Sequence, residues 1–318
     1  MAFDIVTFGS LIVEIIRKDL DCEFDVGAEF MGPYASGDTP IFINAAARLG
    51  AKTGLIGAVG DDDFGKCVMD KLTEAGVDIT YVTRHKNTYT GSTFVMYRSD
   101  GSRRFLYHLT GSGSTMVDPG AFTKEYLSGC KWVHYTGFTL ETSENYRKAV
   151  YRSLKMLDSD TKVSFDPNIR PELFTPDEIR EMCLPIIERA DVVMPSGQEA
   201  ILFTKARTEE EACEMMTDGG KKLVVLKRGD KGCRFFTKDG IIDIPPFIAE
   251  EIDPTGAGDT FDAALLVAFM EGKTIQEAGR FANAAGAFAV TRKGPMEGSP
   301  SRKMIDAFLA SGRTEVKF

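Results

Sequence analysis

The 318-residue sequence lacks any long uncharged apolar stretch, and this absence limits the kinds of protein it can encode. The longest unbroken apolar run in its most apolar helical segment extends only from Ala263 to Met270, far too short to cross a bilayer. The first four residues lack the basic region that opens a secretory signal, and Asp4 and Glu14 interrupt the apolar stretch that follows. We therefore expect a soluble, cytoplasmic protein with no membrane partner.

Cysteine is sparse and scattered. The sequence contains no Cys-x-x-Cys pair, and no pair of histidines lies near any cysteine, so a zinc site is not expected. In a chain of this length, such a distribution is typical of reduced thiols in the core of a protein from a reducing compartment. The six cysteines are Cys22, Cys67, Cys130, Cys183, Cys213 and Cys233.

Basic residues are outnumbered, with 38 Lys and Arg against 47 Asp and Glu, for a formal net charge of −9. Because phosphate backbones are bound by clustered Lys and Arg, this balance argues against a nucleic-acid partner, although a local anionic ligand remains compatible with it. Apolar residues make up 43% of the chain and aromatic residues 10%, which excludes a mainly disordered protein. At about 150 residues per domain, the length suits about two units or one large α/β domain with an appendage.

Alternating strand and helix patterns dominate the chain. We expect strands at 3–9, 53–59, 132–135, 162–166, 192–194, 223–227 and 233–236, and helices at 41–49, 64–75, 143–157, 177–189, 257–271, 275–291 and 301–310. Repeated strand–helix units indicate a mostly parallel sheet covered by helices on both faces. No linker, low-complexity tract or internal repeat divides the main body.

One region breaks the alternation. Residues 93–97 and 103–109 are two β-rich runs separated by Ser-Asp-Gly-Ser, which predicts a hairpin. Residues 11–16 form another short extended run, broken by Glu14, and residues 17–35 have the composition of a loop. Because hairpins do not belong to a parallel crossover pattern, we expect this material to lie beside the main sheet.

The segment 253–262 carries the most specific chemistry. Gly256 and Gly258 stand directly before an apolar helix, where backbone N–H groups can turn inward and hold an anion, aided by the helix dipole. Asp259 lies in the first turn, and no basic residue accompanies it between 253 and 272. An anion cradle beside a carboxylate suits phosphoryl transfer to a hydroxyl. On spacing alone, a tight turn followed by an ordinary N-terminal helix acid explains the pattern equally well.

The same segment, Asp-Pro-Thr-Gly-Ala-Gly-Asp-Thr-Phe at 253–261, closely resembles the C-terminal signature of the PfkB (ribokinase-like) carbohydrate kinase family. The N-terminal signature of that family also has counterparts here, at 36–40, 47–50 and 57–65. These motifs follow one another in the expected order and spacing, so the resemblance covers essentially the whole chain.

The resemblance implies a ribokinase-like α/β fold: a mostly parallel central sheet flanked by helices on both faces, with a small β-sheet lid. It implies one kinase domain over 1–318, into which the lid is inserted at 10–36 and 88–110. ATP, Mg²⁺ and a monovalent cation such as K⁺ are the expected cofactors. Asp259 takes the position of the catalytic base, and Gly256, Ala257 and Gly258 that of the anion hole.

Further site residues follow from the same resemblance. The substrate-binding candidates are Glu14, Gly37, Asp38, Arg170 and Asp259, and the nucleotide-binding candidates are Asn168, Glu199, Lys227, Gly229, Gly256, Gly258 and Asn283. Glu199 is also the candidate for organising the metal. The sequence departs from the family pattern where Ser196 replaces an asparagine, Ser36 a glycine and Ile41 a sugar-binding asparagine, for which Asn44 is a candidate substitute.

Several functions remain open on this evidence. The resemblance is greatest to tagatose kinases and next to 2-keto-3-deoxygluconate kinases. It implies phosphorylation of the terminal primary hydroxyl of a ketohexose of the tagatose or fructose type. Sugar-acid kinases of this type are expected to carry an arginine where Leu109 and Thr110 stand, and we expect Arg103 and Arg104 to face solvent. Because a buried carboxylate without a cation is costly, the neutral sugar is favoured. A nucleoside kinase and a non-catalytic sugar sensor are weaker alternatives.

The hairpin also bears on assembly. Phe94 and Met96 share one face of a strand at 93–97, whereas Thr93, Val95 and Tyr97 share the other, so both faces are substantially apolar. If one face covers a sugar, the second needs cover, and we expect a homodimer formed through the lids. The alternative is that residues 17–35 of the same chain cover it.

Overall fold

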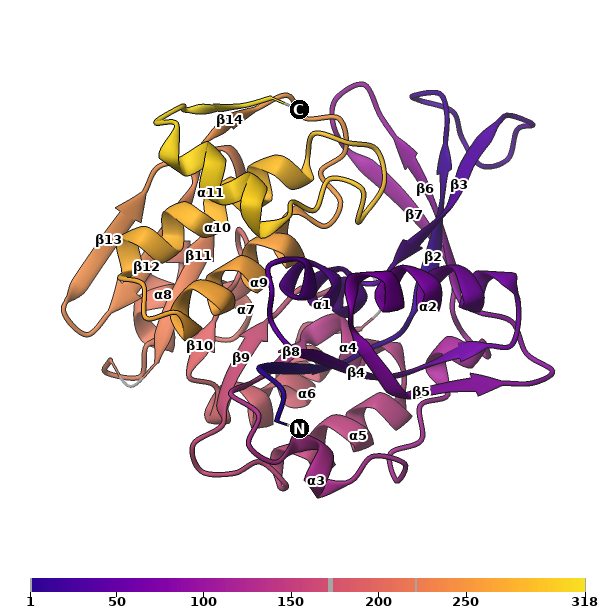
Figure 1. Ribbon diagram of the computed structural model, residues 1–318, viewed down its shortest axis with the longest axis horizontal. Coiled ribbons are helices and arrows are strands. Elements are labelled where there is room, and N and C mark those ends of the chain that lie inside the picture. The colour runs from indigo at the N-terminus through magenta and orange to yellow at the C-terminus, as the bar shows by residue number, and fades with distance from the viewer. Residues whose placement is uncertain (1, 171–173, 221, 318) are drawn as a thin grey trace.

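The computed structural model describes residues 2–170, 174–220 and 222–317, and a nine-stranded sheet forms its centre (Figure 1). Its strands lie in the order β13-β12-β11-β10-β9-β8-β1-β4-β5, parallel from β11 to β5, with β12 and β13 added as an antiparallel edge. The strands are β1 Ile5–Phe8, β4 Thr53–Gly60, β5 Asp78–His85, β8 Trp132–Thr136, β9 Lys162–Asp166, β10 Val192–Val193, β11 Leu223–Lys227, β12 Cys233–Thr237 and β13 Gly240–Ile244.

Helices cover both faces of this sheet because each strand sends alternate apolar side chains to opposite sides. In β1, Ile5 packs into one core, whereas Val6 and Phe8 pack into the other. The first core is closed by α1 Asp38–Arg48, α2 Asp63–Ala75, α9 Ala257–Met270, α10 Ile275–Ala289 and α11 Arg302–Ala310. The second is closed by α3 Lys124–Leu127, α4 Gly137–Thr142, α5 Glu144–Leu154, α6 Pro176–Arg189, α7 Glu199–Leu202 and α8 Glu209–Met216. The expected fold class is confirmed.

A separate four-stranded sheet projects beside α1 and α2, at the upper right of Figure 1, and forms the lid. Its order is β3-β2-β6-β7, with β2 and β6 parallel and the other pairs antiparallel. The strands are β2 Ile12–Arg17, β3 Phe30–Ser36, β6 Ser92–Tyr97 and β7 Arg103–His108. The predicted hairpin is therefore confirmed, and it pairs with strands from the first 36 residues. A short parallel pair, β14 Ile248–Ala249 and β15 Glu315–Val316, lies apart from both sheets.

Several sequence-based boundaries are wrong, each for a tertiary reason. Residues 17–35 are expected to be loop from their composition, but residues 30–35 belong to β3, because the edge of β2 supplies backbone partners. The sequence pattern missed β5 and β13, both of which add to the ends of the main sheet. The predicted helix 143–157 is preceded by a separate short helix, α4, and Ser143 caps the start of α5 with its hydroxyl.

Helix α1 begins three residues earlier than the pattern suggested. Its N-cap is Gly37, whose φ of 111° lies in a region that side chains avoid. A Cβ at this position would also lie 2.5 Å from the carbonyl oxygen of Ser10. The early start brings Asp38 into the first turn, where its carboxylate faces the space under the lid.

Within the described residues, no helix combines the length and the apolar character needed to span a membrane.

Candidate active site

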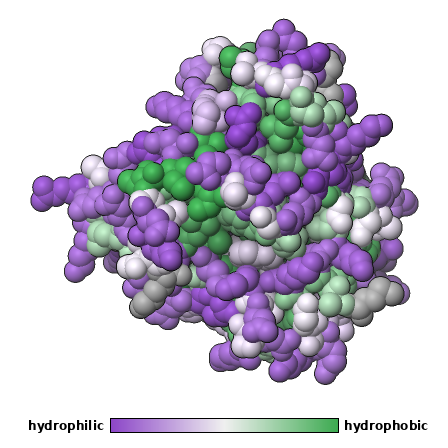
Figure 2. All heavy atoms as spheres, turned by 60° about the vertical axis from the view of Figure 1, so that its left-hand side comes forward, coloured by the Kyte–Doolittle hydropathy of each residue, from purple (hydrophilic) through white to green (hydrophobic). Residues whose placement is uncertain are grey.

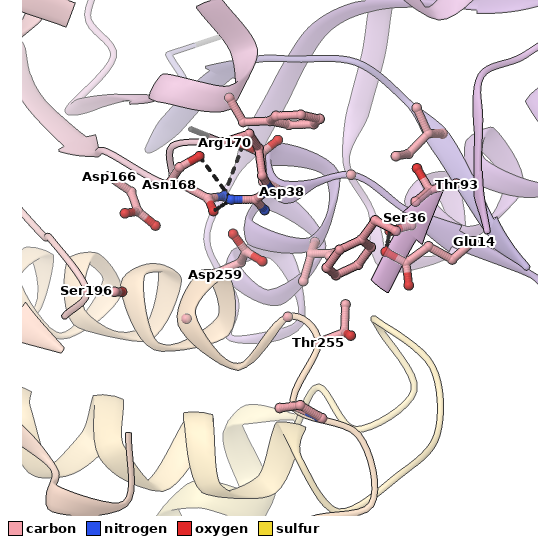
Figure 3. Close-up of a pocket in the computed structure, with 18 of the residues that line it drawn as sticks. Glu14, Ser36, Asp38, Thr93, Asp166, Asn168, Arg170, Ser196, Thr255 and Asp259 are labelled. Carbon is pink, nitrogen blue, oxygen red and sulfur yellow. Dashed lines mark hydrogen bonds between the residues drawn. The ribbon is translucent and has the colours of Figure 1, made fainter. Parts of the chain in front are cut away.

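A cavity of about 420 Å³ lies between the lid and the carboxyl ends of the central strands. In parallel α/β sheets this edge is where ligands bind, because loops and helix N-termini converge there. Two helices, α1 and α9, direct their first turns into the cavity, and β2, β6 and β7 of the lid line its opposite wall. In Figure 3, Asp259 lies between Asp166 and Arg170 on one side and Glu14 with Ser36 on the other.

The lid end of the cavity is built around the Glu14 carboxylate, which is 6% exposed. The hydroxyl of Ser36 donates a 2.8 Å hydrogen bond to Glu14 Oε1. Among the described residues, neither Glu14 Oε2 nor the buried hydroxyl of Thr93 has a hydrogen-bond partner. Burial raises the pKa of Glu14 to about 7. Because buried polar atoms are normally satisfied, this end of the cavity is prepared for a ligand that supplies hydrogen bonds.

The opposite end holds Asp259 in the first turn of α9. Burial, reinforced by the neighbouring Asp38 and Asp166 carboxylates, raises the pKa of Asp259 well above its ordinary value, and Lys227 and Arg170 oppose the rise. A carboxyl whose proton affinity is raised in this way is suited to accept a proton from a substrate hydroxyl.

The turn before α9 depends on glycine. Gly256 has a φ of 78°, and a Cβ there would lie 2.4 Å from the carbonyl oxygen of Pro295. Gly258 faces the cavity, and a Cβ on it would lie 3.6 Å from Lys227 Nζ. The backbone of this turn can therefore approach a ligand closely, as an anion-binding helix N-terminus requires.

Arg170, Asn168 and Asp38 form a connected polar wall beside Asp259. Arg170 Nη1 donates to Asn168 Oδ1 at 2.9 Å, and Asn168 Nδ2 donates to Asp38 Oδ2 at 3.3 Å (Figure 3). The other Asp38 oxygen accepts the backbone N–H of Thr39 at 2.7 Å. Burial raises the pKa of Asp38 above its ordinary value. These contacts hold the Arg170 guanidinium in place among carboxylates, at the end of the cavity where Asp259 lies.

Lys227, which was expected to bind the nucleotide, forms buried ion pairs with two carboxylates of the protein. Its ammonium donates to Asp166 Oδ2 at 2.7 Å and to Asp262 Oδ2 at 2.9 Å, and all three side chains are buried. The two carboxylates hold the pKa of Lys227 above its ordinary value despite burial, which acts in the opposite direction. Lys227 still lines the cavity, but its charge is already shared between two acids.

Glu199 lies at the start of α7 and accepts two backbone N–H groups, from Ile169 at 3.1 Å and from Ser196 at 2.7 Å. Burial raises the pKa of Glu199 to about 7. Nearby, Asp166 Oδ1 is buried and has no partner among the described residues, although Oδ2 binds Lys227. No group of three or more His, Cys, Asp or Glu in the described part of the chain forms a ready-made metal site.

A second, larger hollow of about 950 Å³ continues from the cavity. The two share Arg103, Ser196, Lys227, Pro254 and Gly258 in their walls, so they meet at the start of α9. Figure 2 turns this side of the molecule forward and shows apolar surface gathered in its middle, with hydrophilic side chains around it. Of the predicted nucleotide-binding residues, Lys227, Gly229, Gly258 and Asn283 line this hollow, whereas Asn168, Glu199 and Gly256 line the cavity under the lid instead.

Asn283 contributes shape to this wall. Its Nδ2 group donates to the carbonyl oxygens of Pro245 at 2.8 Å and Ile244 at 3.3 Å, so the amide fixes the loop after β13. Phe247, Ala287 and Val290 supply apolar surface beside it. The hollow thus suits a flat apolar group such as a nucleotide base.

Other expectations are completed or corrected by the structure. Arg103 and Arg104 are both exposed, as expected, but Arg103 also lines the cavity and donates from Nη1 to Thr255 Oγ1 at 3.2 Å. Arg104 pairs with Glu23. Ile41 lines the cavity as expected for its position, whereas the candidate substitute Asn44 is buried and is not part of the cavity wall.

Sequence reasoning missed the roles of Ser36, Thr93 and Thr255. In the sequence, Ser36 stands out only because it replaces a glycine of the family pattern, yet its hydroxyl donates a hydrogen bond that orients the Glu14 carboxylate. No local pattern indicates Thr255, because it becomes part of the cavity wall only where the lid sheet lies over the start of α9. Thr93 could have been indicated by the alternation along residues 93–97, which places it on one face with Tyr97.

Comparisons with known proteins agree with this geometry. The model of the pfkB family carbohydrate kinase matches residues 2–302. Probable fructokinase-3 of Arabidopsis thaliana is 30% identical over 328 positions, covering 99% of this chain and 94% of the relative. A putative ribokinase II from E. coli, solved in complex with ATP and Mg²⁺, is 33% identical with a TM-score of 0.91, covering 98% of this chain and all (100%) of that one. Fructokinase from Vibrio cholerae O395, solved with fructose, ADP and a calcium ion, is 25% identical with a TM-score of 0.81, covering 96% and 99%.

Proposed function

The chain belongs to the pfkB family of carbohydrate kinases and is an ATP-dependent sugar kinase, and we propose that it phosphorylates the terminal primary hydroxyl of a neutral ketohexose. The observation that carries the proposal is the continuity of the two spaces at the start of α9. A small polar cavity under the lid opens beside Asp259 into a larger, partly apolar hollow. This arrangement lets a buried sugar hydroxyl meet the end of a nucleotide.

In the proposed reaction, Asp259 accepts the proton of the attacking hydroxyl while the oxygen forms a bond to the γ-phosphorus of ATP, and ADP leaves. The backbone turn at Gly256, Ala257 and Gly258 stabilises the developing negative charge on the transferred group. Arg170, held by Asn168 beside the base, adds a fixed positive charge.

The residues present fit a metal that arrives with the nucleotide. Asp166 Oδ1 is a buried carboxylate oxygen with no hydrogen-bond partner in the described part of the chain, and Glu199 lines the same cavity. These are oxygen ligands of the kind that Mg²⁺ prefers, directly or through water. Mg²⁺ would supply charge neutralisation between the phosphates, with Glu199 and Asp166 orienting it. The potassium ion in a structure of the Vibrio cholerae fructokinase supports a monovalent cation as a further expectation.

The lid end of the cavity favours a neutral sugar. Glu14 Oε2 and Thr93 Oγ1 have no hydrogen-bond partner among the residues that the structure describes, and hydroxyl groups of a sugar can donate to both. A substrate carboxylate at the same place would meet the Glu14 carboxylate and repel it. The fructokinase relatives support a ketohexose, of the fructose or tagatose type.

A sugar acid such as 2-keto-3-deoxygluconate is the second candidate. Arg103 is exposed but also lines the cavity, and Arg170 lies at the other end, so two cations are within the space available to a substrate. Either could pair with a substrate carboxylate held away from Glu14.

Relative values of kcat/KM decide between these candidates. ADP release is measured with fructose, tagatose, 2-keto-3-deoxygluconate, ribose and a nucleoside at matched ATP and Mg²⁺. We expect the highest kcat/KM with a neutral ketohexose and a 6-phosphate product. A clear preference for the acid, or for the nucleoside, overturns the substrate proposal, and an absence of turnover on every sugar overturns the catalytic one.

We further propose that the chain works as a single kinase domain with its lid at 10–36 and 88–110, and that it dimerises through the lid. Part of the outer lid face is covered by its own chain. Arg17 packs 4.1 Å over the Phe30 ring and donates to the carbonyl oxygens of Glu23 and Val26, and Met96 is buried. Phe30 and Leu106 on the same face are 42% and 44% exposed. Light scattering at micromolar concentration tests this, and a monomeric mass contradicts it.

A further inference from the structure

A buried tyrosine of the lid reaches across to the loop that precedes α9. Tyr97, the last residue of β6, donates a 2.5 Å hydrogen bond from its hydroxyl to Asp253 Oδ1. The same hydroxyl lies 3.0 Å from Thr255 Oγ1, and Thr255 directly precedes Gly256. Tyr97 is 7% exposed and Asp253 is fully buried, so this contact is enclosed between the lid and the body.

Asp253 joins three separate segments of the chain. Besides Tyr97 from the lid, its Oδ1 accepts the backbone N–H of Thr255 at 3.0 Å, within the turn that leads into α9. Its Oδ2 accepts the backbone N–H of Gly294 at 2.9 Å, from the loop after α10. Charge-assisted hydrogen bonds to a buried carboxylate are stronger than neutral ones, so this group fixes the loop geometry firmly.

Further contacts join the lid to the same two loops. Arg103 of β7 donates to Thr255 Oγ1 at 3.2 Å, and Lys293 Nζ lies 3.9 Å from the centre of the Tyr97 ring. A Cβ on Gly294 would lie 2.8 Å from the Tyr34 ring of β3. Three of the four lid strands therefore contact either the entry to α9 or the loop bound to it.

We propose that Tyr97 is a positioning residue that couples the seating of the lid on the sugar cavity to the geometry of the anion-binding turn at 256–258. The inference rests on the proposed kinase function. Tyr97 does not itself line the cavity, so it acts through Asp253 and Thr255. When the lid is seated, its hydroxyl completes the hydrogen bonds of Asp253, and the turn that stabilises the transferred phosphoryl group is held in place.

The hydroxyl is suited to this role at neutral pH. Burial, together with the Asp253 carboxylate, raises the pKa of Tyr97 above its ordinary value, so the group remains a proton donor. The carboxylates facing the tyrosine from other elements are Asp253 and Glu14, and the nearby cations are Lys293 and Arg103.

The test compares Tyr97→Phe with Tyr89→Phe. The first substitution removes the hydroxyl and keeps the ring packed with Ile16, Val95 and Phe105. The matched control removes a half-exposed hydroxyl that donates to the carbonyl oxygen of Thr110, outside the cavity. We expect Tyr97→Phe to lower kcat about 10-fold and to raise KM for the sugar several-fold, with KM for ATP within about 2-fold. Tyr89→Phe should match the wild type.

The split between kcat and KM separates positioning from simple lid anchoring. If the hydroxyl only holds the lid, KM for the sugar rises while kcat stays unchanged, and that result overturns the proposal. Thr255→Val provides a second variant. Since Tyr97 and Thr255 act through one contact, the double variant should lose little more than the worse single variant. Fully additive losses contradict the coupling.

A measurement without substrates makes the inference independent of the kinase proposal. Amide hydrogen exchange of peptides spanning 253–260 should be faster in Tyr97→Phe than in Tyr89→Phe, because the turn loses its contact with the lid. Equal exchange in the two variants overturns the inference even if the enzyme phosphorylates sugars. Faster exchange with no turnover of any sugar supports the lid contact and refutes the kinase function.

Discussion

The two ends of the site recognise their ligands by different means. The cavity under the lid has four charged groups in its walls, of which Glu14 and Asp38 are buried and Asp259 and Arg170 are half-buried. The adjoining hollow is about twice as large; glycine and apolar residues form most of its wall, and of the charged residues that line it only Lys227 is buried. Buried charges are costly unless a ligand or partner satisfies them, so they are concentrated where the chemistry is. Where a ligand is held by shape, contacts with backbone and apolar side chains avoid the desolvation cost of buried charges.

The largest expected difference between the two ends comes from Asp259→Asn. An amide cannot accept the hydroxyl proton, so kcat should fall about 10²–10⁴-fold while KM for ATP changes by less than about 3-fold. Initial-rate kinetics and calorimetric ATP binding measure the two effects. Asp63→Asn, in the exposed first turn of α2, is the matched control for a simple helix-dipole acid. Activity of Asp259→Asn within a few-fold of wild type would remove Asp259 from the catalytic role.

Lys227→Met tests whether the ion pairs of Lys227, which lines both the cavity and the larger hollow, stabilise the fold. It leaves Asp166 and Asp262 as buried carboxylates without their shared cation, so unfolding free energy should fall by about 3–5 kcal/mol. Urea unfolding followed by circular dichroism measures the loss. Lys231→Met, at the exposed rim of the larger hollow, should change stability by less than about 0.5 kcal/mol. Equal stability of the two variants would show that the Lys227 ion pairs are not structural.

Glu14→Gln tests whether the cavity under the lid binds the sugar separately from the nucleotide. The amide keeps the contact with Ser36 but loses the charged acceptor, so KM for the sugar should rise about 10-fold or more, with KM for ATP unchanged. Glu29→Gln, on the exposed edge of the lid, should leave both values unchanged.

The pH dependence of the same variant has a defined sign. The folded-state pKa of Glu14 is about 7, above its ordinary value of 4.5, so between these values the unfolded chain releases a proton that the folded chain retains. This group's contribution to stability therefore falls as pH rises from about 4.5 to 7. The unfolding free energy of Glu14→Gln should match that of the wild type near pH 4.5 and exceed it at pH 8, by at most about 3 kcal/mol. Urea unfolding at the two pH values measures this, and a difference in unfolding free energy that is independent of pH would contradict it.

The smallest effect is expected from the larger hollow. Ala287→Leu adds apolar volume to its wall, so KM for ATP should rise about 10-fold or less, while KM for the sugar stays within about 2-fold. Ala307→Leu on the exposed side of α11 is the control. A rise in the sugar KM as large as the rise in the ATP KM would mean that the two spaces do not bind separate ligands.

Local patterns along the chain predicted the α/β alternation, the hairpin of the lid and the segment that contains Asp259. These follow from local causes: apolar periodicity, turn residues and a glycine-flanked helix start that backbone geometry requires. Strands β3, β5 and β13 escaped prediction because an edge strand depends on a neighbour to supply its backbone hydrogen bonds, and no local pattern records that neighbour.

Tertiary structure alone decided which charges meet. The short-range sequence shows no cation beside Asp259, yet Lys227 approaches it from the end of β11 and Arg170 from the loop after β9. Arg103 is exposed, as its place near the hairpin turn indicates, but the position of the lid also brings it within hydrogen-bond distance of Thr255. Tyr97 and Asp253 are 156 residues apart in the chain and share one buried hydrogen bond. Long-range electrostatics and lid packing depend on the folded arrangement of distant strands, so neither could be derived from spacing along the chain.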